Sequence, residues 1–220
     1  MNKKINAAKK ALEYVEEGKV IGLGSGTTAA EFVRLLAEKE HLGFKIDACV
    51  PTSLDARVCA IKHGLSRYLV DPDQVGGIDI GVDGADLVTK DYVLKGGGAA
   101  LTREKIIAYN SDRFIVIADD SKIPKTNKAT VAMEALTFSV PFTLRTLANM
   151  GYKARVRNGT GKIGPIISDN GNFIIDAEME IKNAGNLESM LNCIPGLLEN
   201  GIFTKFERVI VGTERGASEL

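Results

Sequence analysis

The stretch that decides the fold is Lys19–Glu40, which reads KVIGLGSGTTAAEFVRLLAEKE. Its first five residues form a short apolar run, which is typical of a buried strand. Its second half places Phe32 and Leu36 four residues apart, which predicts a helix over Ala29–Glu40. A glycine-rich turn, Gly22–Thr28, joins the two. A strand, a tight turn and a helix in this order predict an α/β protein with a mostly parallel sheet.

The same alternation continues on both sides of this stretch. Further strands are predicted at Phe44–Val50, Ile78–Val82 and Arg113–Ala118, and further helices at Met1–Gly18, Asp55–His63 and Ala99–Tyr109. Gly18 is expected to end the first helix in a left-handed conformation. Ligand sites of parallel sheets form at the carboxyl ends of the strands. Four polar clusters follow strands in this half of the chain, and we expect all four at that edge.

The pattern changes after the polar segment Pro124–Lys128. Strands are predicted at Leu136–Val140, Lys153–Arg157 and Asn172–Met179, helices at Pro141–Met150 and Leu187–Asn192, and a last strand at Glu207–Gly212. The last strand is expected to rejoin the first sheet. The sequence therefore predicts an α/β domain, 1–127 and 206–220, with a Rossmann-like, mostly parallel sheet and helices on both faces. A smaller α+β domain of ferredoxin-like type is expected over 128–205.

Composition excludes several classes of protein. The 220 residues carry 28 Lys and Arg against 28 Asp and Glu, and 28 − 28 = 0 argues against a nucleic-acid groove. No apolar run approaches the roughly 18 residues of a membrane span, and the first residues have no apolar signal core. Cys49, Cys59 and Cys193 show no CxxC spacing, which favours a reducing compartment, the cytoplasm. Only two histidines are present, so we expect no zinc or other His-based metal site.

The first polar cluster is the turn Gly22–Thr28. Its glycines let backbone amides approach an anion, its hydroxyls add donors, and the helix that follows contributes a favourable potential. Thr27 stands where a dinucleotide fingerprint needs its third glycine, and no Gly-Lys-Ser/Thr of a P-loop follows. The turn therefore predicts a phosphate site, although a plain turn with a capped helix has the same composition.

Two more clusters hold charged side chains at predicted strand ends. Asp83-Gly84-Ala85-Asp86 offers two carboxylates, suited to proton transfer or to sugar hydroxyls, but equally able to cap a turn. Asp119-Asp120-Ser121-Lys122 offers a cation for a phosphate, and a solvated surface lysine is the alternative reading of Lys122.

The remaining cluster is Lys95–Lys105, KGGGAALTREK. Three consecutive glycines, Gly96–Gly98, cost chain entropy that a plain connection rarely needs. They suit backbone amides that must point at developing negative charge, with Lys95 beside them. Glu104 lies in the first turns of the following helix and is a candidate base. Its alternative role is to complement the helix dipole.

Together these segments resemble the A-type ribose-5-phosphate isomerase family. The resemblance covers Ala8–Lys122 almost continuously and resumes at Ser168–Asn172 and Asn192–Gly196. The Lys95–Lys105 block is its most specific part. Three departures fall outside the family's chemical positions: Leu87 replaces a common Glu, and the segments 128–135 and 204–208 differ from the usual pattern.

The resemblance implies interconversion of D-ribose 5-phosphate and D-ribulose 5-phosphate through an enediolate, without metal or organic cofactor. It implies that Glu104 is the base and that Lys95 and the glycine amides stabilise the enediolate. It assigns ring opening to Asp83 and binding of substrate hydroxyls to Asp86. The implied substrate-binding set is Ser25, Gly26, Thr27, Thr28, Asp83, Gly84, Ala85, Asp86, Lys95, Gly96, Gly97, Gly98 and Lys122. A homodimer or homotetramer, assembled through the smaller domain, is also implied.

Three other functions share part of this pattern. By resemblance, the same fold occurs in regulators that sense sugar phosphates or nucleotides without turnover. A CoA-transferase uses a glutamate as nucleophile, and a nicotinamide oxidoreductase binds a dinucleotide at a glycine-rich turn. The joint presence of Asp83, Lys95 and Glu104 favours the isomerase, and the missing fingerprint disfavours the oxidoreductase.

Overall fold

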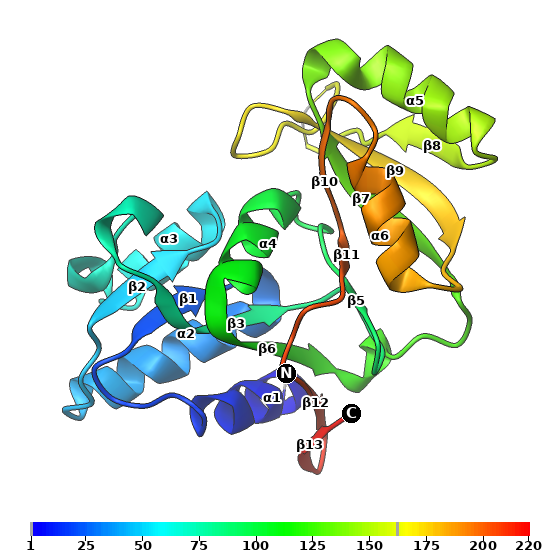
Figure 1. Cartoon of the computed structure of the whole chain (residues 1–220). Helices are drawn as coiled ribbons and strands as arrows, with labels where there is room; N and C mark the ends of the chain where they lie inside the picture. Colours follow the sequence, from blue (N-terminus) through cyan, green and yellow to red (C-terminus); the bar gives the residue numbers. More distant parts are fainter. Residues whose placement is uncertain (1, 162) are drawn as a thin grey trace. The chain divides into compact units, whose positions relative to one another are not determined.

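The computed structural model describes residues 2–161 and 163–220 and divides into two compact units (Figure 1). Unit 1 consists of Met1–Lys90, Arg103–Ile123 and Lys205–Leu220. Unit 2 consists of Asp91–Thr102 and Pro124–Thr204. Each unit is therefore assembled from segments that are distant in the sequence.

Unit 1 is built on a six-stranded sheet in the order β13-β12-β6-β3-β1-β2. Its strands are β1 (Val20–Leu23), β2 (Ala48–Pro51), β3 (Ile78–Gly84), β6 (Ser111–Asp119), β12 (Arg208–Thr213) and β13 (Gly216–Glu219). The neighbours from β2 to β12 pair in parallel, and β13 alone is antiparallel. The predicted mostly parallel sheet is confirmed, including the return of the chain to the sheet through β12.

The helices of unit 1 follow the predicted alternation with shifted ends. They are α1 (Asn2–Leu12), α2 (Gly26–His41), α3 (Leu54–Lys62) and α4 (Leu101–Asn110), with 3-10 turns at Ser66–Tyr68, Pro72–Gln74 and Asp120–Lys122. The two-residue strand β4 (Leu87–Val88) follows β3. The first two residues of α4 are grouped with unit 2.

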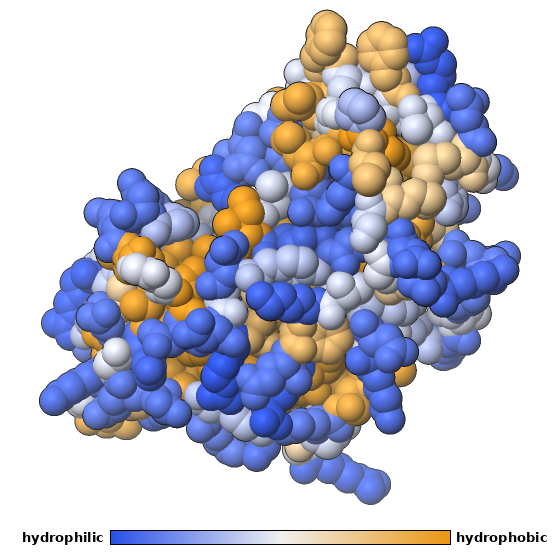
Figure 2. All heavy atoms as spheres, viewed as in Figure 1, coloured by the Kyte–Doolittle hydropathy of each residue, from blue (hydrophilic) through white to orange (hydrophobic). Residues whose placement is uncertain are grey.

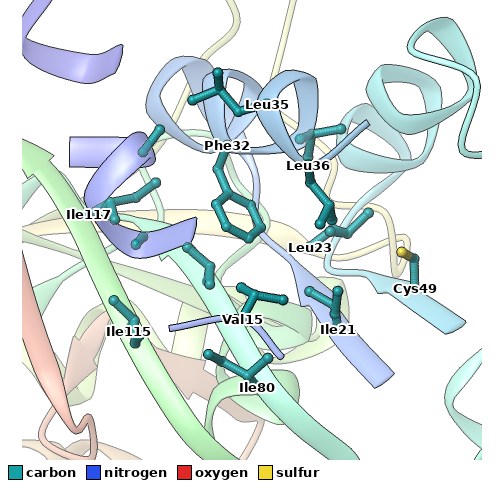
Figure 3. Close-up of a cluster of buried hydrophobic side chains, with 14 of the residues drawn as sticks. Val15, Ile21, Leu23, Phe32, Leu35, Leu36, Cys49, Ile80, Ile115 and Ile117 are labelled. Atoms are coloured by element: carbon teal, nitrogen blue, oxygen red, sulfur yellow. The ribbon is translucent and has the colours of Figure 1, made fainter. Parts of the chain in front are cut away.

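Helices cover both faces of the sheet, as predicted. On one face, the side chains of α1 and α2 pack against strand residues such as Ile21 and Ile80, with Phe32 at the centre (Figure 3). On the other face, Ile107 of α4 packs with Val50 and Ile78. Full burial of one such side chain is worth roughly 1.5–3 kcal/mol.

Unit 2 contains a four-stranded antiparallel sheet in the order β10-β7-β9-β8. Its elements are β7 (Lys128–Ala135), a 3-10 turn (Thr137–Ser139), α5 (Val140–Asn149), β8 (Lys153–Val156), β9 (Phe173–Glu180), α6 (Ala184–Asn192) and β10 (Leu197–Asn200). The sequence β-α-β-β-α-β with this strand order is the expected ferredoxin-like arrangement. A second, smaller pairing joins β5 (Val93–Leu94) to β11 (Ile202–Phe203).

Several predicted elements differ in extent from the structure, among them the strand expected at Phe44–Val50, because β2 begins only at Ala48. The strand expected at Leu136–Val140 is a 3-10 turn that leads into α5, and the strand is β7, directly before it. Pro141 suits the first turn of a helix, so α5 begins at Val140, within the range predicted as a strand. The first residue of the helix predicted over Met1–Gly18 lies outside the described residues, and α1 ends at Leu12, after which the hydrogen bonds tighten from i→i−4 to i→i−3. Gly18 has the expected positive φ, 69°, but lies beyond the helix end.

Candidate active site

The turn after β1 lies at the carboxyl edge of the sheet in unit 1. Gly26 has φ +84° and begins α2, and both Gly26 and Thr27 are exposed. Ser25 precedes the helix, but its side chain makes no capping hydrogen bond. Its hydroxyl instead lies 2.8 Å from Thr52 Oγ1 and 2.6 Å from Ser53 Oγ. The first turn of α2 is thus exposed beside a cluster of hydroxyls, an arrangement that suits an anion.

Asp83, at the end of β3, holds the turn after β1 through a hydrogen bond to its backbone. Its carboxylate is fully buried, and Oδ1 accepts hydrogen bonds from the Ser25 N–H at 2.9 Å and the Gly84 N–H at 2.6 Å. A Cβ on Gly24 would lie 2.2 Å from Asp83 Oδ1, so only glycine fits there. Oδ2 is shielded from solvent as well. Asp86, three residues later, is exposed, and Ala85 is half-buried between them.

Glu104 is a buried carboxylate on α4, 5% exposed, and Oε2 has no contact with solvent. Three residues later, Ile107 packs directly over β1, since a Cβ on Gly22 would lie 2.6 Å from Ile107 Cγ2. Residues three apart share a helix face, so Glu104 also faces the sheet. Because α4 runs directly into the amino end of β6, a parallel strand of the large sheet, its first turn with Glu104 lies toward the opposite, carboxyl edge, where Asp83 and the β1 turn are found.

Two lysines bring positive charge to the same edge. Lys122, predicted from the sequence, follows Asp119 at the end of β6. Lys4 on α1 was not predicted, and its Nζ donates a 2.7 Å hydrogen bond to Thr27 Oγ1. Burial raises the pKa of Asp119, but hydrogen bonds from Ser121 and the charges of Lys122 and Lys4 outweigh it and hold that pKa below its ordinary value.

The Lys95–Gly98 segment belongs to unit 2 and not to the strand ends of the large sheet. It follows β5, and the Lys95 N–H donates to the carbonyl of Gly201 at 2.9 Å. Lys95 is 4% exposed, and its Nζ lies 5.8 Å from the centre of the Phe203 ring. The expectation that all four polar clusters follow strands of one sheet is therefore wrong for this cluster. β5 pairs antiparallel with β11, and two residues are too few to reveal that in the sequence.

The glycine segment forms a tight turn with unusual backbone angles. Gly96 has φ +101°, and Ala99 has φ +64° although it is not a glycine. The Ala99 N–H closes the turn on the Gly96 carbonyl at 3.1 Å, while Gly97 and Gly98 are exposed between them. Strained backbone of this kind persists only where the surroundings hold it, and it is common at functional sites.

Within residues 2–161 and 163–220, no group of three or more His, Cys, Asp or Glu side chains is arranged to hold a metal ion. Over the same residues, no helix has the length and apolar character needed to cross a membrane. The buried carboxylates can perform acid–base chemistry, and the backbone amides and lysines can bind an anion.

The fold and the sequence of this chain are similar to those of sugar-phosphate isomerases. The family model of ribose 5-phosphate isomerase A (phosphoriboisomerase A) matches residues 48–216. A ribose-5-phosphate isomerase A of Pyrococcus horikoshii is 45% identical over 220 residues, which cover 97% of this chain and 95% of the relative. The chain belongs to the ribose-5-phosphate isomerase A family.

Solved structures agree. The ribose 5-phosphate isomerase A of Methanocaldococcus jannaschii superposes with a TM-score of 0.93 at 41% identity, covering 99% of this chain and 97% of the other. A D-ribose-5-phosphate isomerase in complex with phospho-erythronic acid gives a TM-score of 0.94 at 43% identity, covering 100% and 99%. The family predicted from the sequence is confirmed, and so is the fold.

Proposed function

We propose that Glu104, Asp83 and Lys95 carry the isomerisation of D-ribose 5-phosphate and D-ribulose 5-phosphate in this protein. The activity itself follows from family membership: the chain is a ribose-5-phosphate isomerase of the pentose phosphate pathway. The assignment to residues rests mainly on one observation. Glu104 is a buried carboxylate on the face of α4 that packs against the sheet, near the edge where the β1 turn and Asp83 lie.

The reaction moves one carbon-bound proton from C2 to C1. In our proposal the Glu104 carboxylate takes the C2 proton of the open-chain aldose, which leaves an enediolate. The same carboxyl group returns the proton to C1, while a proton passes from the C2 hydroxyl to the C1 oxygen. A positioned acid/base typically contributes about 10²–10⁴ in rate. Asp83 opens the sugar ring and handles the hydroxyl proton, and Asp86 binds substrate hydroxyls.

The enediolate oxygens carry the negative charge that must be stabilised. We assign this role to the Lys95 ammonium and the amides of the Gly96–Gly98 turn, which the first turn of α4 joins to Glu104 along the chain. Preorganised donors of this kind are often the largest catalytic contribution. Phospho-erythronic acid, bound in the related structure, combines a phosphate with a carboxylate and is suited to imitate the enediolate.

The substrate phosphate anchors the molecule away from the reacting carbons. We propose that it binds at the first turn of α2, with Ser25, Gly26, Thr27, Thr28 and Lys122 as donors and with Lys4 as a further cation. Binding energy from the phosphate can then orient C1 and C2 for proton transfer.

The decisive experiment follows the reaction by proton NMR in D₂O with metals chelated. Ribulose 5-phosphate with deuterium at the exchanging carbon is expected from the wild type. Glu104→Gln is expected to lose most turnover and to retain substrate binding, while Glu38→Gln, an exposed glutamate on α2, keeps both. Near-normal turnover of Glu104→Gln would refute the base assignment, and binding without turnover by the wild type would indicate a sensor protein.

We further propose a homo-oligomer in the cytoplasm. Four exposed apolar side chains of unit 2, Leu136, Phe138, Phe142 and Leu198, form a candidate contact surface. They lie near one another because the Leu136 N–H donates to the carbonyl of Gly196 at 2.9 Å, and Figure 2 shows hydrophobic side chains gathered near α5. Contiguous apolar patches of this kind mark interfaces. The mass of the protein in solution decides between monomer, dimer and tetramer.

The three free cysteines suit a reducing compartment, which supports the proposed location in the cytoplasm.

A further inference from the structure

Arg157, directly after β8, contacts the backbone of the glycine turn. Its Nη1 donates to the carbonyl oxygen of Gly96 at 2.7 Å and to that of Gly97 at 3.1 Å. The side chain is only 16% exposed, although it carries a charge. Its own backbone is fixed by a 2.8 Å hydrogen bond from the Arg157 N–H to the carbonyl of Ile174 on β9. The guanidinium therefore reaches the turn from a rigid part of unit 2.

Asp176 on β9 fixes the orientation of this guanidinium. Nε of Arg157 donates to Oδ2 at 2.8 Å and Nη2 donates to Oδ1 at 2.5 Å, a two-point pairing of planar groups. Asp176 is 12% exposed, so this ion pair is largely shielded from water. Nη1 remains for the two carbonyls. Only arginine can make both interactions at once, because its donors form a rigid planar fork.

The two contacted carbonyls decide where two amide N–H groups point. A trans peptide is planar, and its C=O and N–H point in opposite directions. When the Gly96 and Gly97 carbonyls turn toward Arg157, the N–H groups of Gly97 and Gly98 turn to the opposite side. Two adjacent amides then point the same way, which is the geometry of an oxyanion site. Hydrogen bonds from a cation to the carbonyls also polarise these peptides.

The conformation that Arg157 holds is one the chain does not favour by itself. The turn lies between Gly96 at φ +101° and Ala99 at φ +64°, and glycines have wide conformational freedom. A Cβ on Gly96 would lie 2.8 Å from the Cβ of Ala132 on β7, so the turn also presses against the sheet of unit 2. Without Arg157, the Gly96 and Gly97 carbonyls lose the charged donor toward which both are turned.

We infer that Arg157, oriented by Asp176, is a positioning residue that presets the Gly97 and Gly98 amides for the enediolate. This inference rests on the proposed role of the glycine turn and adds the group that orders it. Arg157 stabilises the transition state through the turn and makes no contact with the substrate phosphate. Its loss should therefore reduce kcat and leave KM nearly unchanged.

The test compares Arg157→Met with Arg155→Met, which removes an exposed arginine from the neighbouring strand β8. Removal of one oxyanion donor in other enzymes costs about 10²–10³ in kcat, so disorder of the amide pair is expected to cost about 10–100-fold. KM should stay within about twofold, and Arg155→Met should match the wild type. Arg157→Lys restores a charge but not the planar fork, so it should recover only part of the loss.

Two ligands separate positioning from a general structural role. A four-carbon sugar-acid phosphate carries a carboxylate that imitates the enediolate, whereas an alditol phosphate offers the phosphate alone. Arg157→Met should lower the affinity for the sugar-acid phosphate by about the same factor as it lowers kcat. It should leave the affinity for the alditol phosphate unchanged. Equal weakening of both ligands, or unchanged kcat, would overturn the inference. Asp176→Asn preserves the shape of the pair and should show the same selective loss if Arg157→Met fails to fold.

Lys95→Met distinguishes failure of this inference from failure of the proposed function. If Lys95→Met loses turnover and Arg157→Met keeps it, the positioning role of Arg157 is wrong and the glycine turn keeps its proposed role. If neither variant loses turnover, the role of the whole turn is wrong.

Discussion

Lys4 and Lys122 bring positive charge to the exposed start of α2 from elements that are distant in the sequence. Lys4 donates to Thr27 at 2.7 Å, and both lysines are close enough to Asp119 to lower its pKa. An ammonium beside amides of a helix N-terminus is well suited to a phosphate dianion. Lys4 is therefore expected to contribute to substrate binding more than to proton transfer.

The first prediction concerns this lysine. Lys4→Met removes one charged donor, and a hydrogen bond to a charged group is worth about 1.5 kcal/mol or more, close to a factor of ten. KM for ribose 5-phosphate should rise about tenfold, with a smaller change in kcat. Lys9→Met, an exposed lysine on the same helix, serves as control in the same steady-state assay. A fall in kcat at constant KM would show that Lys4 does not anchor the phosphate.

Candidate site residues can be selected from the sequence where a short motif surrounds them. Asp83, Glu104 and Lys95 stand close to glycines in unusual patterns, so their neighbours mark them as candidates. Lys4 is not selected in this way, because nothing in the pattern of α1 distinguishes it from the other lysines of that helix. Only the fold brings it to Thr27, 23 residues away.

Glu134 of β7 holds the Ser168–Asn172 segment in place through hydrogen bonds. Its carboxylate is fully buried and accepts hydrogen bonds from Thr102 Oγ1 at 2.5 Å and Ser168 Oγ at 2.7 Å. The side-chain amides of Asn170 and Asn172 donate to the same carboxylate at 3.1 Å and 2.8 Å. The Ser168–Asn172 segment is thus a turn folded around the buried Glu134 side chain, and Thr102 attaches the first turn of α4 to the same side chain.

The second prediction is a loss of stability in Glu134→Ala. The substitution leaves several buried donors without their acceptor, and removal of one member of such a network costs about 3 kcal/mol or more. Glu178→Ala, on the exposed side of β9, should change the free energy of unfolding by less than about 0.5 kcal/mol. Urea unfolding followed by circular dichroism measures both, since the chain has no tryptophan. Equal effects in the two variants would contradict the buried network.

Asp79 of β3 stabilises the first strand of the sheet in a pH-dependent way. The N–H of Val20 donates to Oδ2 at 2.8 Å, and the Lys19 ammonium lies 2.9 Å from Oδ1. The hydrogen bond from Val20, and then Lys19, hold the pKa of Asp79 below its ordinary value against the opposing effect of burial. A lowered pKa in the folded state stabilises the protein above the unfolded pKa near 3.9.

The third prediction follows from that sign. As the pH falls through the folded pKa of Asp79, its contribution is lost, so the free energy of unfolding should decrease between about pH 5 and pH 3. Asp79→Asn should be less stable than the wild type at pH 6 and should lose stability less steeply toward pH 3. Asp47→Asn, an exposed control, should keep the wild-type slope. A wild-type slope in Asp79→Asn would rule out this linkage.

Elements of unit 1 were easier to predict than those of unit 2. Strands such as β3 and β6 are buried on both faces and read as apolar runs, which locate them well. β7 was missed because its first three residues are polar or small and its buried part runs directly into Leu136. The two-residue strands β5 and β11 are defined only by their pairing with each other, which no local pattern reveals.

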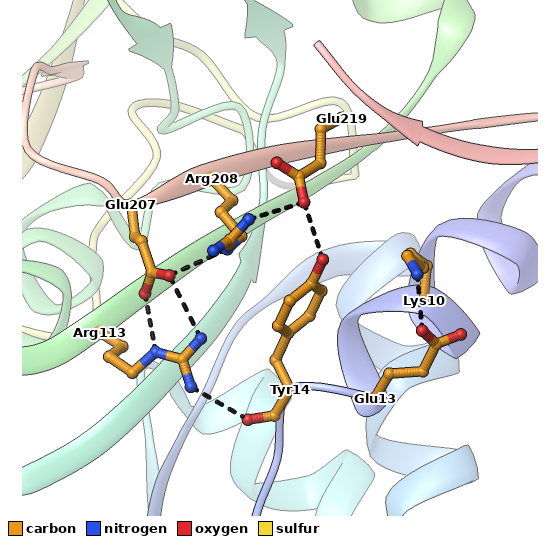
Figure 4. A network of polar contacts seen from close by, with 7 residues as sticks. All are labelled: Lys10, Glu13, Tyr14, Arg113, Glu207, Arg208 and Glu219. Atoms are coloured by element: carbon orange, nitrogen blue, oxygen red, sulfur yellow. Dashed lines mark hydrogen bonds and ion pairs between the residues drawn. The ribbon is translucent and has the colours of Figure 1, made fainter.

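At the scale of the whole molecule, the two ends of the chain complete unit 1. A polar network connects the segment after α1 to the last strands: the Tyr14 hydroxyl donates to Glu219 at 2.8 Å, and Arg208 pairs with both Glu219 and Glu207 (Figure 4). Arg113 of β6 also pairs with Glu207, and this hydrogen bond, followed by that of Arg208, outweighs burial and lowers the pKa of the Glu207 carboxyl. The hydrogen bond to Glu219 raises the pKa of Tyr14. Unit 1 therefore depends on contacts between residues about 200 positions apart.

This arrangement explains why the sequence predicts that a last strand rejoins the sheet of unit 1 but does not predict which strand it pairs with. The apolar residues 209–211 mark a buried strand, but nothing in the local sequence indicates that this strand pairs with β6. Gly212 carries the missing information, because a Cβ there would lie 1.9 Å from the carbonyl oxygen of Lys3 and 2.9 Å from the nitrogen of Ala7. The backbone of α1 thus rests directly on β12, and only a glycine permits that approach.

The fourth prediction tests this closure of the unit. Gly212→Ala places a methyl group against the backbone of α1, which cannot yield as a flexible side chain would, so α1 must move away from β12. The buried Ala7, Ala8 and Ala11 then lose part of their packing. We expect a loss of about 3 kcal/mol or more in the free energy of unfolding, as for other severe steric changes in a core. Gly77→Ala, with open space around its Cβ position, should be nearly neutral. Hydrogen exchange should locate the loss of protection in α1, β12 and β13, whereas protection lost first in β7 and β9 would contradict a role confined to unit 1.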